Sequence, residues 1–152
     1  PSQNYKFLYY LYNMQKYYWD PLRRKEVPAT PEELVRQSFI EYLNKELGYP
    51  LSLMASEYST TYNGRAYRAD IVLFNRSLKP VMIVECKAPS VKIDSNVVSQ
   101  VLRYNLSFGG EGVETLVVTN GKTTCAMVYN REEKCYRFVE RIPEYISVEK
   151  DK

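Results

Sequence analysis

Two short runs in the middle of the 152-residue chain, residues 71–74 and 81–84, are apolar at every position. A strand with one face in water alternates apolar and polar side chains, whereas a strand covered on both faces is apolar throughout. The residues between the two runs, 75–80, end in Lys-Pro and are typical of a turn. We therefore expect an antiparallel hairpin in the middle of a sheet, with other elements packed against both of its faces.

A helix is predicted ahead of these strands. Thr30 can act as its N-cap, Pro31 suits the first helical position, and Glu33 completes a capping box. Gly48 is expected to end the helix. The apolar residues in between recur at helical spacing and are Val35, Phe39, Leu43 and Leu47. This spacing predicts a helix with one face on the core.

Another hairpin is predicted between this helix and the central strands. Residues 57–62 are rich in Thr and Tyr, which favour strands. Asn63-Gly64 is a strong signal for a tight turn, after which the chain returns through residues 65–74. The first central strand is therefore expected to pair on both of its edges.

A second helix is expected after the central hairpin, capped by Asp94 or Ser95 and ended by Gly109-Gly110. Strands are then expected at residues 116–118, 123–129 and 136–139. This order predicts an α/β fold with a mixed β-sheet whose antiparallel hairpin is flanked by helices. The strand after the second helix is expected to run parallel to its neighbour.

The chain is long enough for one domain and too short for two. We expect that domain to span residues 28–152. Residues 1–27 are rich in Tyr, end near the basic run Arg23-Arg24-Lys25, and are predicted to form an N-terminal extension. The extension either packs on the domain through its aromatic side chains or serves as an arm that stacks on bases and contacts phosphates.

The chain has no histidine. This excludes Ser-His-Asp and Cys-His catalysis and the ordinary zinc sites that are rich in histidine. The glycines within residues 109–112 lack the spacing of a phosphate-binding loop. An enzyme of this composition would therefore depend on carboxylates, Lys, Tyr or a hard metal ion. The net charge of +3 permits a polyanionic partner without requiring one.

Three cysteines, Cys86, Cys125 and Cys135, form no CxxC pair, and their odd number does not suggest a disulfide framework. No stretch approaches the roughly 18–20 apolar residues of a membrane span. The N-terminal residues also lack the pattern of a signal peptide. We therefore expect a cytoplasmic protein without a membrane partner.

Charged residues lie at one end of the central hairpin, where Asp70 precedes the first run and Glu85 and Lys87 follow the second. A symmetric hairpin has its midpoint in the turn, between Ser77 and Leu78. The resulting pairs are Phe74 with Val81, Val72 with Ile83, and Asp70 with Glu85. A bulge in the turn would shift this register by one residue.

Directly opposed side chains have Cβ atoms about 4.5–5.5 Å apart. Asp70 and Glu85 would therefore repel each other unless a divalent cation such as Mg²⁺, which prefers carboxylate oxygens, lies between them. Because side chains alternate along a strand, Lys87 shares the face of Glu85, and Cys86 points into the opposite layer. The alternative is a simple ion pair of Asp70 with Lys87 or with Arg68.

The segments RADIV at residues 68–72 and IVECKAP at residues 83–89 are similar to the core of PD-(D/E)XK nucleases. They resemble most the N-terminal nuclease domain of the type I restriction enzyme R subunit. Further stretches that resemble this group lie at residues 19–23, 30–37 and 118–121 and at Gln100 with Tyr104. The resemblance covers the chain from about Trp19 to Asn120 and implies a restriction-endonuclease-like core. Ala69 stands where the family name has proline.

The resemblance also implies a division of labour at the site. Asp70, Glu85 and the backbone carbonyl of Cys86 would bind Mg²⁺, for which Mn²⁺ can substitute. Lys87 would steady the attacking water or the scissile phosphate. Glu33, or its neighbour Glu32, would be the additional acid that such nucleases carry on the first helix.

Gln100 and Tyr104 match the QxxxY motif of this group and would contact DNA, and Arg36 is expected among the DNA-binding residues as well. The implied function is Mg²⁺-dependent hydrolysis of DNA. Motor or specificity subunits would be supplied by partner chains, and self-association is left open. The alternative is a non-catalytic nucleic-acid-binding or protein-interaction module of the same fold.

Overall fold

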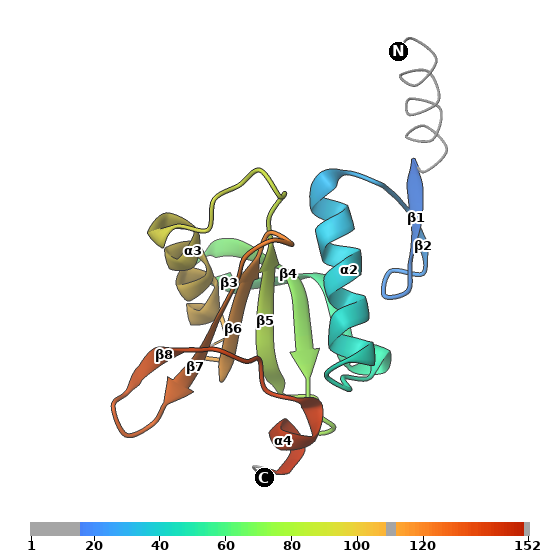
Figure 1. Ribbon diagram of the computed structural model, residues 1–152. Coiled ribbons are helices and arrows are strands. Elements are labelled where there is room, and N and C mark those ends of the chain that lie inside the picture. Colours follow the sequence, from blue (N-terminus) through green and yellow to red (C-terminus); the bar gives the residue numbers. More distant parts are fainter. Residues whose placement is uncertain (1–15, 109–111, 151–152) are drawn as a thin grey trace.

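The computed structural model describes residues 16–108 and 112–150 and contains a six-stranded sheet flanked by helices (Figure 1). The strands follow the order β3-β4-β5-β6-β7-β8, and a separate hairpin, β1-β2, precedes them. The strands are β1 Tyr17–Asp20, β2 Lys25–Pro28, β3 Met54–Tyr62, β4 Arg65–Phe74, β5 Pro80–Cys86, β6 Thr115–Thr119, β7 Thr124–Asn130 and β8 Cys135–Val139. The helices are α2 Pro31–Lys45, α3 Ser95–Leu106, α4 Tyr145–Lys150 and a short 3-10 helix, Leu51–Leu53.

The predicted order of a helix, three strands, a second helix and further strands is confirmed from α2 to β8, whereas the β1-β2 hairpin and α4 were not predicted. Pairing is antiparallel throughout the sheet except between β5 and β6, which run parallel as expected for the strand after the second helix. The predictions for residues 1–15 and for Gly109-Gly110 lie outside the described residues. In the part of the chain that the structure describes, no helix is long and apolar enough to cross a membrane.

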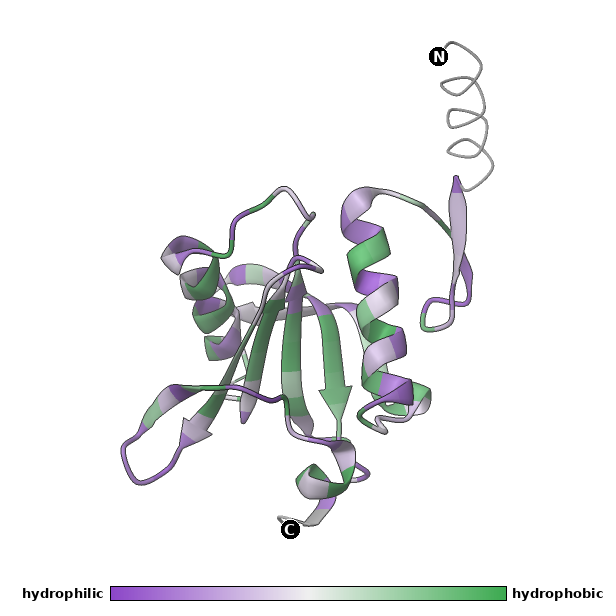
Figure 2. Cartoon of the chain, viewed as in Figure 1, coloured by the Kyte–Doolittle hydropathy of each residue, from purple (hydrophilic) through white to green (hydrophobic). Residues whose placement is uncertain are grey.

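The two central strands are covered on both faces, as their continuous apolar runs predicted (Figures 1 and 2). Ile71, Leu73 and Val84 belong to a buried cluster shared with α2, whereas Val72 and Ile83 belong to a second cluster shared with α3. All five side chains are fully buried. The mixed α/β sandwich of the prediction is therefore the observed fold, and α2 and α3 occupy its outer layers.

The register of the central hairpin is as predicted near the charged residues and differs at the turn. Val72 pairs with Ile83, as expected, but Phe74 pairs with Pro80 instead of Val81. The side chain of Asn75 accepts hydrogen bonds from the backbone of the turn and shortens it by one residue on the β5 side. A bulge between Leu73 and Phe74 absorbs the difference, so the shift does not reach the other end of the hairpin.

The cap of α2 is confirmed, since the Thr30 hydroxyl accepts a hydrogen bond from the Glu33 backbone at 3.1 Å. The second half of the predicted capping box is wrong. The Thr30 N–H donates to the carbonyl of Pro28, and the Glu33 carboxylate binds other partners, among them Gln37. The carboxylate does not return to the Thr30 N–H because it pairs with Arg23 and Arg36.

Asp94 is the N-cap of helix α3, and its carboxylate accepts a hydrogen bond from the Val97 backbone at 3.1 Å. Its buried Asn105 links three elements. The amide oxygen accepts a hydrogen bond from Val113, and the amide nitrogen donates to the Tyr136 hydroxyl. These bonds attach α3 to the start of β6 and to β8, and they fix the helix against the sheet.

We predict that Gly112→Ala destabilises the protein more than Gly64→Ala does. Both glycines have left-handed backbones, with φ of +81° and +74°, so both substitutions strain the chain by about 1–2 kcal/mol. Only at Gly112 would the new Cβ also collide with Asn105, whose amide is held by hydrogen bonds. Displacing that amide should cost about 1–3 kcal/mol more, measurable by urea unfolding. Equal losses in the two variants would contradict a structural role for the contact.

Candidate active site

The predicted acidic pair meets at the carboxyl end of β5. Ile71 pairs with Val84, so Asp70 lies opposite Glu85, one position beyond this pair. One Asp70 oxygen, Oδ2, accepts a hydrogen bond from the Cys86 backbone N–H at 2.7 Å. The structure thus brings the two carboxylates together at the end of the sheet.

Glu85 is buried in an unfavourable electrostatic environment. It is 7% exposed, and its Oε2 atom is buried without a hydrogen-bond partner among the described residues. Burial raises the pKa of Glu85 to about 8, and the negative charge of Asp70 adds to the increase, whereas Lys87 opposes it. The Lys87 ammonium lies 3.4 Å from Glu85 Oε1. A buried carboxylate oxygen without a partner next to a second carboxylate is a site that a cation would stabilise.

Arg36 was expected to contact DNA, but it is not on the surface. It belongs to α2 and lies next to Asp70. It is 5% exposed, and its Nη2 atom lies 2.9 Å from Asp70 Oδ1. Its Nη1 atom lies 3.2 Å from Glu33 and 3.4 Å from Glu57. Burial opposes the charge of Arg36, but these carboxylates outweigh it and raise its pKa. Asp70 is therefore paired with Arg36, and not with Lys87 or Arg68 as the ion-pair alternative had it.

Glu33, the predicted helix acid, is separated from Asp70 by Arg36. Its Oε1 atom accepts hydrogen bonds from Arg23 and from Gln37, the latter at 3.0 Å. Its Oε2 atom faces Arg36. Both carboxylate oxygens of Glu33 are thus paired with side-chain N–H groups. Glu33 is connected to Asp70 only through the Arg36 guanidinium, which pairs with both carboxylates.

The β1-β2 hairpin is attached to the site by Arg23. This side chain pairs with Asp20, which is fully buried, as well as with Glu33. Burial opposes ionisation of Asp20, but hydrogen bonds from Arg23 and from the Leu22 backbone outweigh it and lower its pKa. A continuous chain of ion pairs therefore runs from the N-terminal hairpin to Asp70.

Glu57 is a member of this network that the sequence reasoning missed. It lies in β3 opposite Asp70, between the pairs Ser56–Ile71 and Tyr58–Ala69. Its backbone is left-handed, with φ of +52°, an uncommon conformation for a residue with a side chain. The Asn63-Gly64 turn fixes the register that places Glu57 there, so counting back from that turn could have identified it.

The network carries an excess of negative charge. Five carboxylates and three cations meet there, which leaves two uncompensated negative charges when all are ionised: Asp20, Glu33, Glu57, Asp70 and Glu85 against Arg23, Arg36 and Lys87. Within residues 16–108 and 112–150, no group of three or more His, Cys, Asp or Glu side chains is arranged to hold a metal ion. A cation would thus depend on two carboxylates and a backbone oxygen, which are hard donors that suit Mg²⁺.

The predicted DNA contacts Gln100 and Tyr104 lie on α3, one helical turn apart. Gln100 is exposed, and Tyr104 is half-buried. Burial raises the pKa of Tyr104, and the negative charges of Glu85 and Asp70 add to the increase, whereas Lys87 and Arg103 oppose it. The Tyr104 ring also packs edge-on against Tyr67 of β4, with ring centroids 5.6 Å apart.

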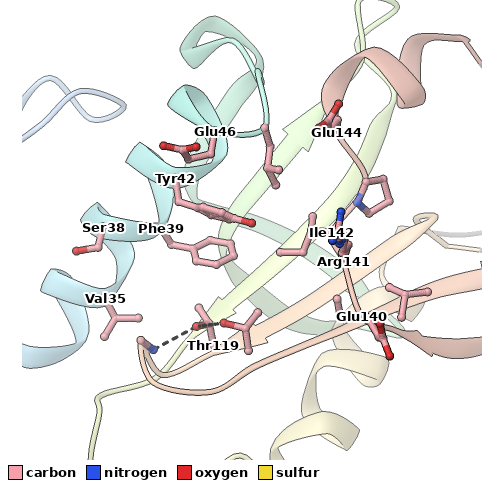
Figure 3. A pocket seen from close by; sticks show the side chains of 16 residues that line it. Val35, Ser38, Phe39, Tyr42, Glu46, Thr119, Glu140, Arg141, Ile142 and Glu144 are labelled. Carbon is pink, nitrogen blue, oxygen red and sulfur yellow. Dashed lines mark hydrogen bonds between the residues drawn. The ribbon is translucent and has the colours of Figure 1, made fainter.

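A large pocket lies apart from the acidic network (Figure 3). Its volume is about 920 Å³, and it lies between α2, the β6-β7 turn and residues 139–144. Val35 and Phe39 line one wall, and Thr119 and Ile142 line others. No residue of the acidic network lines this pocket, so the candidate active site lies outside it.

The mixed sheet, its antiparallel central hairpin and the helices on both faces have the architecture of a restriction-endonuclease-like fold. The sequence profile of the family described as type I restriction enzyme R protein N terminus (HSDR_N) matches residues 31–143, and the chain belongs to this family. The match includes α2, the central hairpin and α3.

The fold is similar to a solved fragment from Vibrio vulnificus YJ016, assigned as an HsdR subunit of a type I restriction enzyme. The TM-score is 0.56 at 19% sequence identity, and the match covers 78% of this chain. The chain spans 24% of that longer chain. None of the curated proteins compared with this chain matches it.

We predict that Arg23→Ala lowers the free energy of unfolding by on the order of 3–5 kcal/mol, because it leaves Asp20 and Glu33 buried without their shared cation. Lys45→Ala is the matched control, since Lys45 pairs with Glu41 on the surface and its loss should hardly change the stability. Urea unfolding of both variants measures the difference. A loss for Arg23→Ala as small as that of the control would contradict a structural role for the network.

We also predict that Glu85→Gln stabilises the metal-free protein at high pH. Folding raises the pKa of Glu85 from 4.5 to about 8, so its protonated form is favoured in the folded state. The stability this provides is complete below about pH 4.5 and is lost as the pH rises towards about 8. Glutamine mimics the protonated carboxyl and should avoid that loss.

Thermal melting in EDTA from about pH 5 to about pH 9 checks the prediction. The melting temperature of Glu85→Gln should exceed that of the unsubstituted protein by an amount that grows with pH. Glu41→Gln makes the same substitution at an exposed position and should show no such trend. A constant difference between Glu85→Gln and the unsubstituted protein would sink the idea of a buried, repelled carboxylate.

Proposed function

We propose that the chain is a metal-dependent nuclease domain that hydrolyses phosphodiester bonds in DNA, with Asp70, Glu85 and Lys87 as its active centre. The observation that carries the proposal is the buried, partnerless oxygen of Glu85 beside a second carboxylate. Membership of the type I restriction enzyme R protein family supports the nuclease assignment. A divalent cation would offset the excess of negative charge that the fold concentrates at this point.

Mg²⁺ is the proposed cofactor, and Mn²⁺ would substitute for it. Asp70, Glu85 and the Cys86 carbonyl would hold the ion, which supplies Lewis acidity and lowers the pKa of a water molecule. The Cys86 N–H and the Arg36 guanidinium fix the Asp70 carboxylate in place. Because the carboxylate is held before the ion arrives, little reorganisation is needed when it binds.

Lys87 would stabilise the negative charge of the scissile phosphate. Its backbone N–H donates to the Thr119 carbonyl at 2.8 Å, so the residue continues the pairing of β5 with β6. Its side chain is 23% exposed and lies beside Glu85. A compact ammonium group held at the end of a rigid sheet is suited to interact with a phosphate oxygen.

The family also supports a setting for this activity. We propose that the domain works on DNA with the other subunits of a type I restriction enzyme, which would supply movement along DNA and choice of sequence. The described cysteines, Cys86, Cys125 and Cys135, are free thiols, which fits a reducing compartment such as the cytoplasm.

We predict that the protein cleaves supercoiled plasmid in Mg²⁺ or Mn²⁺, and that Asp70→Ala and Lys87→Ala each lower the rate by about 100-fold or more. Asp70→Ala removes a proposed ion ligand, and Lys87→Ala removes the charge that faces the phosphate. EDTA should abolish cleavage by the unsubstituted protein. Gel analysis of nicked and linear plasmid over time gives the rates.

Glu41→Ala and Lys45→Ala are the controls, because they remove an exposed carboxylate and an exposed ammonium on the outer side of α2. Both should cleave at the unsubstituted rate. Cleavage that persists in Asp70→Ala would show that the activity comes from elsewhere. A protein that binds DNA in Mg²⁺ without cutting it would favour the non-catalytic module.

A further inference from the structure

Strands β3 and β4 continue past the end of the sheet at which β5 stops. Within the described chain, β4 pairs with β5 only from Ile71 onward. The earlier residues of β4 pair with β3 alone, as far as Tyr62 and Arg65. The two strands therefore leave the sheet as a two-stranded ribbon that begins beside Asp70.

Helix α3 lies along one side of this ribbon. The Thr60 hydroxyl donates a hydrogen bond to the Ser107 carbonyl at 3.2 Å. At the same level of the ribbon, Tyr67, the β4 partner of Thr60, meets Tyr104 edge to face. Ribbon and helix thus lie side by side, and β4 of the ribbon continues to Asp70.

The ribbon and α3 carry only positive charge. Neither residues 58–69 of the ribbon nor α3 contains an aspartate or glutamate, whereas together they hold three arginines. These arginines, Arg65, Arg68 and Arg103, are exposed, and none makes an ion pair with a described residue. The acidic network lies on the other side of the site, towards α2. Charge is therefore segregated about the carboxylate pair.

Two of the arginines lie close to the tyrosine pair in their own elements. Arg65 precedes Tyr67 by two positions in β4 and shares its face. On α3, Arg103 lies one helical turn after Gln100 and adjoins Tyr104. We define the ribbon–α3 face as the set Arg65, Tyr67, Gln100, Arg103 and Tyr104.

We propose that the ribbon–α3 face binds the phosphate backbone of duplex DNA and presents it to Asp70 and Glu85. The proposal rests on the nuclease function proposed above and adds Arg65, Tyr67 and Arg103 to it. Unpaired arginines bind phosphate oxygens by charge-assisted hydrogen bonds, and the hydroxyl and amide groups of the face add neutral donors. A two-stranded ribbon also has a width that the major groove of a duplex admits.

A duplex fits this face better than a single strand does. Proteins that bind single strands offer free aromatic faces on which successive bases stack. Here Tyr67 and Tyr104 contact each other edge to face, and both are half-buried. Because the two rings contact each other, they are not free to stack on bases. The arginines around them provide the positive charge that binding to a phosphate backbone requires.

The test is the affinity of the full chain for a short fluorescent duplex, measured by anisotropy in EDTA at several salt concentrations. Metal-dependent cleavage cannot occur in EDTA, so the result does not depend on the nuclease proposal. We expect Arg65→Ser with Arg103→Ser to weaken binding about tenfold or more at low salt. Loss of two phosphate contacts should also make the slope of log affinity against log salt less negative by about two.

The control variant is Arg131→Ser with Lys134→Ser, which removes two exposed cations from the β7-β8 turn. It should bind like the unsubstituted protein, and melting curves should show that both double variants are folded. An unchanged affinity and salt slope in the Arg65/Arg103 variant would overturn the proposal. Weakened binding to single strands alone, with duplex binding unchanged, would overturn it as well.

If the unsubstituted protein does not bind the duplex in EDTA, the ribbon–α3 face is wrong, while plasmid cleavage still decides the nuclease proposal. If it binds as expected but never cleaves, the face is right and the nuclease proposal fails. The two ideas are therefore decided by separate measurements.

Discussion

The Asp70 carboxylate joins three elements at the end of the sheet. One oxygen accepts the Cys86 backbone N–H and so ties β4 to β5 beyond their last ladder pair, and the other pairs with Arg36 of α2. A guanidinium as buried as that of Arg36 needs carboxylates around it, since an unpaired charge in the interior is costly. Glu33 and Glu57 meet that need, and Glu33 in turn holds Arg23 and the N-terminal hairpin. Much of the polar architecture thus follows from fixing this one side chain.

The site has a region with excess negative charge and a region with positive charge, and the two would neutralise each other if they were mixed. The carboxylates and the cations that bind them are buried or half-buried, mostly towards α2, and the exposed arginines lie towards α3 and the β3-β4 ribbon. A polyanion that approaches from the α3 side meets positive charge first, and the excess negative charge lies deeper, at the end of β5. A divalent cation between the two would screen the carboxylates from the phosphate. The sheet keeps the two regions apart because its strands are rigid and covered on both faces.

Local signals explain why much of the fold was predictable. The apolar runs of β4 and β5, the Asn63-Gly64 turn and the caps at Thr30 and Asp94 depend on neighbouring residues only, and the structure confirms each of them. Predictions failed where a residue had a distant competitor. The Glu33 carboxylate left its capping box for Arg23 and Arg36, and Asn75 reshaped a turn that symmetry alone would have made longer.

By itself, the sequence determined the layered α/β fold, because strand period and apolar patterning depend on neighbouring residues. It also indicated the alignment of Asp70 with Glu85, which the structure keeps because the bulge between Leu73 and Phe74 offsets the shortened turn. Only the tertiary structure decided that Arg36 points inward to Asp70, that Arg23 links the N-terminal hairpin to the site, and that α3 lies along the ribbon. Spacing along the chain carries no information about such pairs. Long charged side chains have many rotamers, and the partner that each one reaches is set by how the helices pack against the sheet.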